Sequence, residues 1–302
     1  MNETTIDHKQ LLAGLSDEDR VSLTEKSDRQ GLFNLAAHIL AMVVSGSWIF
    51  LGMWGWQFVM LLHGIQIIFL FTLLHETVHF TPFESAWINR VVGWVSGFLI
   101  FIPPLWFRYF HLAHHRYTHD PEKDPELENP QVTSFRRYVW LVTGIPVWCS
   151  QFKTLLSNAI GNFDYAYLPS PVKNRVIWEA RAMIGLYAVI SAGSYAVGSS
   201  VLLYLWILPA VLGQPFLRLY LMAEHGRCPH VANMLENTRT TYTTRIVRWL
   251  AWNMPFHIEH HAYPAVPYYK LPEFHQYTRS HISVEEGGYS AFHRETVSEI
   301  AG

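Results

Sequence analysis

Charged residues are scarce in this sequence. Asp, Glu, Lys and Arg make up 15% of the 302 residues, whereas half of the chain is apolar. A typical soluble domain has roughly 25% charged residues. The deficit is local, because stretches such as residues 33–54 contain no charge at all. This composition is typical of an integral membrane protein.

Cysteine is nearly absent as well. Cys149 and Cys228 are too few for a disulfide framework and lack the CxxC spacing of zinc or iron–sulfur sites, so we expect free thiols. A net charge of −2 without a basic arm argues against a nucleic-acid partner. The polar N-terminus MNETTIDHKQ lacks a basic segment followed by an apolar one, so we expect no secretory signal.

Four apolar segments are long enough to cross a bilayer, which takes about 20 residues as a helix. The predicted spans are residues 33–54, 56–77, 180–199 and 201–222. They form two predicted hairpins with tight turns near 55 and 199. The apolar segment Val91 to Phe107 is shorter and ends in Pro103-Pro104, so we expect a buried or interfacial helix there. The predicted fold is an all-α integral membrane protein, with residues 1–302 as a single domain.

All 22 Lys and Arg residues lie on one side of this four-span arrangement, and the two tight turns carry none. The positive-inside rule makes that side cytoplasmic. We therefore expect residues 1–32 to be a cytoplasmic segment, and residues 78–179 and 223–302 to form a cytoplasmic helical cap. The alternative is a soluble protein with very apolar core helices. It is disfavoured because the two helical hairpins have no polar face for water.

Histidine, by contrast, is abundant, with 17 residues. Eight of them lie in three short clusters, HETVH, HLAHH and HIEHH, and His225 follows the last span. The candidate metal ligands are His75, His79, His111, His114, His115, His225, His257, His260 and His261. On a helix, positions i, i+3 and i+4 share one face, so each cluster directs its imidazoles to the same volume.

Nine histidines exceed the needs of one metal. A catalytic zinc site uses three protein ligands and a water, whereas nine imidazoles suit two metals with four or five nitrogens each. Zinc, copper, iron and nickel all accept imidazole, so histidine chemistry alone does not choose the metal. We expect His119 beside the site rather than in it, and Asn253 in a helix-terminal hydrogen bond rather than near a metal. The scattered histidines are expected to be structural.

The three clusters on this four-span skeleton resemble the histidine boxes of the membrane fatty acid desaturase and hydroxylase superfamily. HHRYTHDPEKDPEL and NMPFHIEHHAYPAVP resemble its small bacterial branch, over residues 35–275. The resemblance implies a bacterial inner-membrane enzyme whose nine histidines hold two non-haem irons. It implies O₂-dependent oxidation, by desaturation or hydroxylation, of an unactivated C–H bond in a fatty-acyl or other lipid-like substrate. Electrons would come from a separate ferredoxin- or cytochrome-type protein, because no cytochrome b5 signature or four-cysteine spacing is present.

Neutral imidazoles leave the metal charge uncompensated, so we expect carboxylates nearby. Glu76, Glu224 and Glu259 each adjoin a candidate ligand, and we predict that at least one accepts the distal N–H of a histidine. Asp120 and Asp124 follow the second box. The alternative for Glu76 and Glu259 is that they face water.

Two further groups of residues have two interpretations each. Six aromatic residues are expected either to line a slot for an alkyl chain or to pack between helices: Trp87, Trp94, Phe98, Phe101, Trp106 and Phe107. Three arginines hold an anionic group or donor protein, or form a solvated face: Arg239, Arg245 and Arg248.

Two other functions compete with the oxidoreductase. A zinc intramembrane metalloprotease would use His75, Glu76 and His79, but it normally needs an Asp from another span, and the later spans contain none. A metal transporter would place its ligands at mid-membrane depth, whereas all nine candidates are expected at one boundary. The substrate, the electron donor and the oligomeric state remain open.

Overall fold

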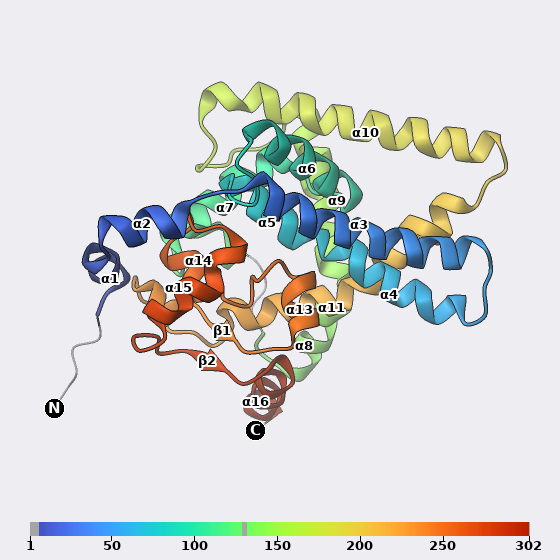
Figure 1. Cartoon of the computed structure of the whole chain (residues 1–302). Coiled ribbons are helices and arrows are strands. Elements are labelled where there is room, and N and C mark those ends of the chain that lie inside the picture. The colour runs from blue at the N-terminus through green and yellow to red at the C-terminus, as the bar shows by residue number, and fades with distance from the viewer. Residues whose placement is uncertain (1–5, 129–131, 302) are drawn as a thin grey trace.

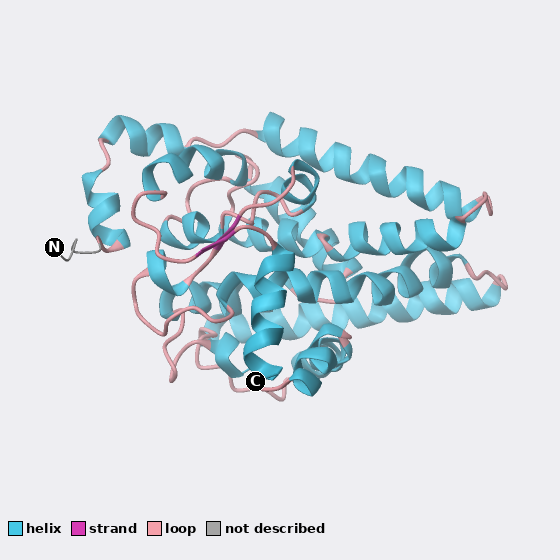
Figure 2. Cartoon of the chain, turned by 90° about the horizontal axis from the view of Figure 1, so that it is seen from below, coloured by secondary structure: helices cyan, strands magenta, loops and turns pink. Residues whose placement is uncertain are grey.

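The structure is a computed structural model that describes residues 6–128 and 132–301, and these residues are mostly helical (Figures 1 and 2). The helices of the first 225 residues are α1 His8–Gly14, α2 Asp17–Thr24, α3 Asp28–Phe50, α4 Trp56–Ile68, α5 Leu70–His79, α6 Ala86–Leu99, α7 Pro104–Tyr117, α8 Phe135–Val142, α9 Ile145–Ile160, α10 Lys173–Ala196 and α11 Leu208–His225. The C-terminal helices are α12 Met234–Asn237, α13 Arg245–Leu250, α14 His257–Ala262, α15 Leu271–Thr278 and α16 Tyr289–Ala301.

Short elements connect these helices. The 3₁₀ turns are η1 Pro125–Glu128, η2 Ser170–Val172 and η4 Tyr268–Lys270, and a π-helical segment, η3 Leu203–Ile207, precedes α11. Strands β1 Thr240–Thr241 and β2 Glu285–Glu286 pair in parallel, with Thr240 opposite Glu285.

Within residues 6–128 and 132–301, four helical segments are long and apolar enough to cross a membrane, which agrees with the number of predicted spans. They cover Asp17–Phe50, Trp56–His79, Ser170–Ala196 and Leu203–His225. The first of these begins at Asp17 because it includes α2 as well as α3. Helix α3 itself begins at Asp28, before residue 33, where Ser27 caps it, its side chain accepting from the Gln30 N–H. It ends at Phe50 rather than 54, since Gly52 and Gly55 adopt positive φ in the turn that follows.

Two glycines bring α4 and α11 into backbone contact. A Cβ atom added at Gly64 would lie 1.9 Å from the Pro209 carbonyl oxygen, and one added at Gly213 would lie 2.3 Å from the Gly64 carbonyl carbon. Only glycine permits such an approach. Since α4 leads into α5 and α11 ends at His225, this contact places the ends of α5 and α11 close together.

The two helices of the second predicted hairpin have different main partners. Helix α10 packs along α9, whereas α11 packs along α4, and Figure 1 shows α10 along the upper edge of the molecule. Helix α3 packs along α4 as well.

The single helix predicted for Val91 to Phe107 is wrong. This segment belongs to two helices, α6 and α7, whose axes differ by 100°. Phe101 has a φ of 63°, and Pro104 begins α7, so the chain turns sharply between them. The Phe101 ring stacks on Trp206 with a centroid distance of 5.1 Å, which fixes the turn against η3. The turn directs α7 and its histidines toward α5.

The N-terminal segment packs on the C-terminal region. The Ser27 N–H donates to the Tyr269 hydroxyl, which lies 2.6 Å away, and the Tyr277 hydroxyl donates to Asp19. The core beneath this contact contains fully buried apolar side chains, among them Trp252, Leu235 and Phe274. These contacts hold α14 and α15 beside α5.

Candidate metal centre

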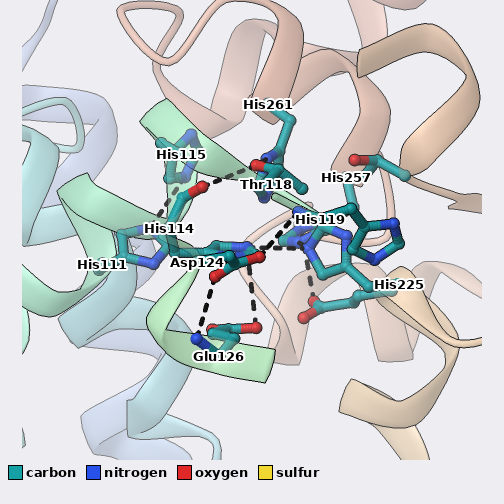
Figure 3. A network of polar contacts seen from close by, with 12 residues as sticks. His111, His114, His115, Thr118, His119, Asp124, Glu126, His225, His257 and His261 are labelled. Atoms are coloured by element: carbon teal, nitrogen blue, oxygen red, sulfur yellow. Dashed lines mark hydrogen bonds and ion pairs between the residues drawn. The ribbon is translucent and has the colours of Figure 1, made fainter. Parts of the chain in front are cut away.

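The nine candidate histidines gather in one place, from four helices that are far apart in the sequence. Helix α5 supplies His75 and His79, α7 supplies His111, His114 and His115, the last residue of α11 is His225, and α14 supplies His257, His260 and His261. Seven of the nine are buried, and His79 and His225 are half-buried. Figure 3 shows the side of this cluster that faces Asp124.

The ring nitrogens form two adjoining groups. His75, His111, His115 and His260 offer nitrogens within 4.8 Å of one another, and the Nε2 of His79 lies 2.9 Å from the Nε2 of His111. We call these five histidines the first group.

The second group comprises His114, His225 and His261, whose nitrogens also lie within 4.8 Å, together with His257. The Nε2 of His257 is 3.2 Å from that of His225. The rings of His115 and His261 are stacked with centroids 4.0 Å apart, so the two groups are neighbours.

These positions fit metal ligation. Nε2 atoms meet at 3.1 Å between His114 and His225 and at 2.9 Å between His111 and His115. Two nitrogens bound about 2.1 Å from one metal, at a right angle, are about 3.0 Å apart. Within the described residues, the buried His261 Nε2 has no hydrogen-bond partner. A metal would satisfy such an atom, which is otherwise costly to bury.

The electrostatics of the site also favour metal binding. Burial lowers the pKa of His257 and His261 well below the ordinary value, and neighbouring histidines lower both further. Both side chains are therefore neutral at neutral pH. Neutral imidazole is the form that binds a metal.

Asp124 is the carboxylate most closely connected to the cluster. Its Oδ1 lies 3.0 Å from the His114 Nδ1, and its two oxygens accept from the backbone N–H groups of His119 and Glu126. Burial alone would raise the pKa of Asp124, but the hydrogen bond and the charge of His114, together with these N–H groups, lower it. Asp124 stays ionised and leaves the Nε2 of His114 directed at the second group (Figure 3).

The three predicted glutamates have different positions. The Oε1 of Glu76 lies 3.4 Å from the His260 Nδ1, and the Oε1 of Glu224 lies 3.5 Å from the His257 Nδ1. Glu259 contacts no candidate ligand, because its Oε1 accepts from Thr278 and lies 2.7 Å from the His275 Nδ1. The alternative that Glu76 and Glu259 face water is wrong, since both are fully buried.

His119 and Asn253 lie outside both groups. The Nδ1 of His119 is 3.0 Å from the Pro229 carbonyl oxygen, and its ring centroid is 5.6 Å from that of His225. Asn253 donates to the Tyr268 carbonyl and accepts from Arg248. Scattered histidines make structural contacts too, such as the 2.9 Å contact between the His38 Nε2 and the Gln66 carbonyl oxygen.

A cavity of about 680 Å³ opens beside the cluster. Its walls include His75, His111, His114, His225 and His257. Its apolar walls include Phe71, Ile102, Trp106, Phe107, Phe110 and Leu141. Two of the six predicted slot aromatics, Trp106 and Phe107, therefore lie here.

The remaining aromatics and the three arginines lie elsewhere. Trp94, Phe98 and Phe101 join a packed aromatic stack, and Trp87 is exposed. Arg239 is buried and donates to the carbonyls of Ala223 and Gly226. Arg245 and Arg248 line a separate cavity of about 210 Å³.

Two candidate spans end at two adjoining groups of buried histidines, an arrangement that fits metal binding in a membrane protein. Comparison with known families makes the class specific. The family model described as fatty acid desaturase matches residues 47–289, and the chain belongs to this family. It is an oxidoreductase.

Individual relatives are distant in sequence. The chain is 24% identical to dihydrorhizobitoxine desaturase of Bradyrhizobium elkanii, over 78% of this chain and 70% of the relative. It is 27% identical to sphingolipid delta(4)-desaturase DES1 of Drosophila melanogaster, over 73% of this chain and 65% of the relative. It is 26% identical to sphingolipid delta(4)-desaturase/C4-monooxygenase DES2 of Mus musculus, over 75% and 65%. The alignments thus cover 65 to 70% of these relatives.

The zinc protease alternative is not supported. Glu76 is fully buried, and its Oε2 accepts from the Thr81 hydroxyl and from the Tyr268 N–H. The two histidines of HETVH lie among seven others rather than forming an isolated pair. The family match agrees with this geometry.

Proposed function

We propose that this protein is an O₂-dependent di-iron oxidoreductase that oxidises an unactivated C–H bond of a fatty-acyl or other lipid-like substrate. One observation supports it above all others. Two adjoining groups of histidines face a cavity that also has an apolar wall, which includes Phe71, Phe107 and Phe110. The family match agrees with this chemistry. The active site faces the cytoplasm at a bacterial inner membrane, where a separate ferredoxin- or cytochrome-type protein delivers electrons.

The chain's own residues would bind the metals, orient the ligating imidazoles and exclude water from the cavity. The five imidazoles of the first group would hold one iron, and the four of the second group would hold the other. Bound iron supplies the redox chemistry that lets O₂ attack a C–H bond. Asp124 keeps His114 in the tautomer that presents Nε2. Glu76 and Glu224 place carboxylate oxygens 3.4 Å and 3.5 Å from the Nδ1 atoms of His260 and His257, where they supply nearby negative charge without a hydrogen bond.

The apolar wall holds the alkyl part of the substrate. Trp106, Phe107 and Phe110 lie along the same cavity as His111, so an alkyl chain against them would pass beside the metals in a space poor in water. Desaturation and hydroxylation both begin with removal of one hydrogen. The name of the mouse relative includes both activities. We propose one or both for this cavity.

Metal analysis combined with turnover tests this function. Purified protein should contain close to two irons per chain and should consume O₂ in an NAD(P)H-dependent manner once a reductase and donor protein are added. Zinc binds more tightly than Fe²⁺ at most sites, so metal content is read together with activity. A single tightly bound zinc with peptide cleavage would overturn the proposal.

Replacing Glu76 separates the oxidoreductase from the protease. Glu76→Gln keeps the shape of the side chain, so an oxidoreductase should keep its metal and part of its turnover. A protease that uses Glu76 as its general base should lose all activity. Glu84→Gln, at an exposed position, is the matched control and should behave as the unmodified protein in either case.

A further inference from the structure

Glu126 is a carboxylate that the nine-histidine arrangement does not use. It lies in η1, ten residues or so after the second histidine box, and its Oε2 is 3.7 Å from the Nε2 of His114. That nitrogen is the one directed at the second group, because the Nδ1 of His114 is hydrogen-bonded to Asp124 and the Nε2 lies 3.1 Å from the Nε2 of His225. The carboxylate therefore approaches the ligating side of His114.

The distance fits a shared metal. Two ligand atoms about 2.1 Å from one metal are about 3.0 Å apart at a right angle and about 4.2 Å apart when opposed. The 3.7 Å between the Glu126 Oε2 and the His114 Nε2 falls between these limits. A carboxylate placed merely to orient an imidazole would contact the distal nitrogen instead, as Asp124 does.

The backbone of η1 fixes Glu126 in this position. The Glu126 N–H donates to the Asp124 Oδ1 at 3.0 Å, and the Leu127 N–H donates to the Asp124 carbonyl. Asp124 thus holds His114 and Glu126 at the same time, which Figure 3 shows as one connected network. Both Glu126 and His114 line the 680 Å³ cavity.

The two histidine groups also differ in number. The first has five imidazoles and the second has four. Every one of these ligands is neutral when bound, so the second position has room for a further ligand and no anion of its own. Carboxylate with imidazole is a common donor set for non-haem iron.

We propose that the Glu126 carboxylate binds the metal held by His114, His225, His257 and His261, as an anionic ligand in addition to the nine histidines. The two metals are then chemically unequal, one with five imidazoles and one with four imidazoles and a carboxylate. This inference rests on the proposed function, since it assumes two metals in the cluster.

A competing role for Glu126 follows from Arg218, which lines the same cavity. Glu126 would then serve as the partner of Arg218 or contact a polar end of the substrate. In either case its loss would change substrate affinity but not the metal.

Iron content and Mössbauer spectra of protein loaded with ⁵⁷Fe test the proposal without relying on turnover. The unmodified protein should show two iron sites with different quadrupole doublets. Glu126→Gln should lose iron from one site, so that the content falls about twofold and the doublet of the five-imidazole site persists. Glu128→Gln, an exposed residue of the same turn, is the control and should keep both sites.

Cobalt provides a positive test that does not depend on losing a metal. In a Cys149→Ser, Cys228→Ser background, Glu126→Cys loaded with Co²⁺ should show a thiolate-to-cobalt charge-transfer band, and Glu128→Cys should not. If Glu126→Gln keeps two irons and both doublets, the inference is wrong while the di-iron function stands. If the unmodified protein does not bind two metals, both proposals fail.

Discussion

Asp124 joins the second histidine box to the turn that follows it, through one contact with His114 and two backbone N–H groups. Asp124→Asn keeps the shape but removes the charge that fixes His114. Loss of such a partner typically lowers metal affinity by about 10- to 100-fold. We expect a loss of that size in competition titrations with a chelator. Asp120→Asn, four residues earlier and paired with Lys123 at the surface, should have no effect on metal affinity.

The charge of Asp124 also predicts a pH dependence. Because its pKa is lowered in the folded protein, the ionised carboxylate stabilises the fold above its ordinary pKa, and this stabilisation is lost as the pH falls through the lowered value. Acid melts should therefore show a smaller loss of stability in Asp124→Asn than in the unmodified protein. Equal losses in the two proteins would contradict the assignment.

At the level of single residues, spacing within each box was enough to find the histidines, because i, i+3 and i+4 positions share a helix face. The contacts of the carboxylates were harder to predict from the sequence. Glu259 adjoins His260 in sequence but points to Thr278, since neighbouring residues face different sides of a helix. Glu126 is two residues beyond Asp124, in a turn whose path against α7 no local pattern specifies.

At the level of elements, the contact between α4 and α11 controls whether the histidines meet. Gly64→Ala would place a methyl group against the Pro209 carbonyl and force the helices apart. Overpacking of this kind costs about 1–3 kcal/mol or more. We expect a lower melting temperature together with lower metal content, because α4 leads to His75 and α11 ends at His225.

The control for this change is Gly193→Ala in α10, where an added Cβ would meet nothing within 4 Å. It should leave the metal content unchanged and, since alanine favours helix more than glycine, should not lower the melting temperature. If both variants behave alike, the close contact of α4 with α11 is not what aligns the cluster.

The number of spans was predictable because runs without charge are visible in the sequence, but their bounds were not. Which helices pack together was not, since Gly64 and Gly213 are remote in sequence and a glycine in an apolar run does not name its partner. The bend at Phe101 was only partly predictable from the sequence. Pro103-Pro104 indicated where a helix ends, but the left-handed Phe101 and its stacking on Trp206 depend on a span more than a hundred residues later.

At the level of the whole molecule, the distribution of basic residues predicts one orientation in the membrane. In the four-span arrangement predicted from the sequence, all 22 Lys and Arg residues lie on the side of the three histidine boxes, and the turns near residues 55 and 199 carry none. Those two turns should therefore face away from the cytoplasm. This prediction is tested with the protein in its native membrane, and the test does not require the protein to be active.

Single cysteines introduced into a Cys149→Ser, Cys228→Ser background test this orientation. Trp54→Cys and Ser200→Cys, at exposed positions of the two turns, should react with a membrane-impermeant maleimide in cells whose inner membrane is intact. Glu18→Cys and Glu122→Cys, exposed on the histidine side, should react only after that membrane is permeabilised. Labelling of Glu18→Cys and Glu122→Cys in intact cells would show the reverse orientation and place the metal centre outside the cytoplasm. A cytosolic electron donor could not reach it there, and the reducing environment that keeps Fe²⁺ available would be absent.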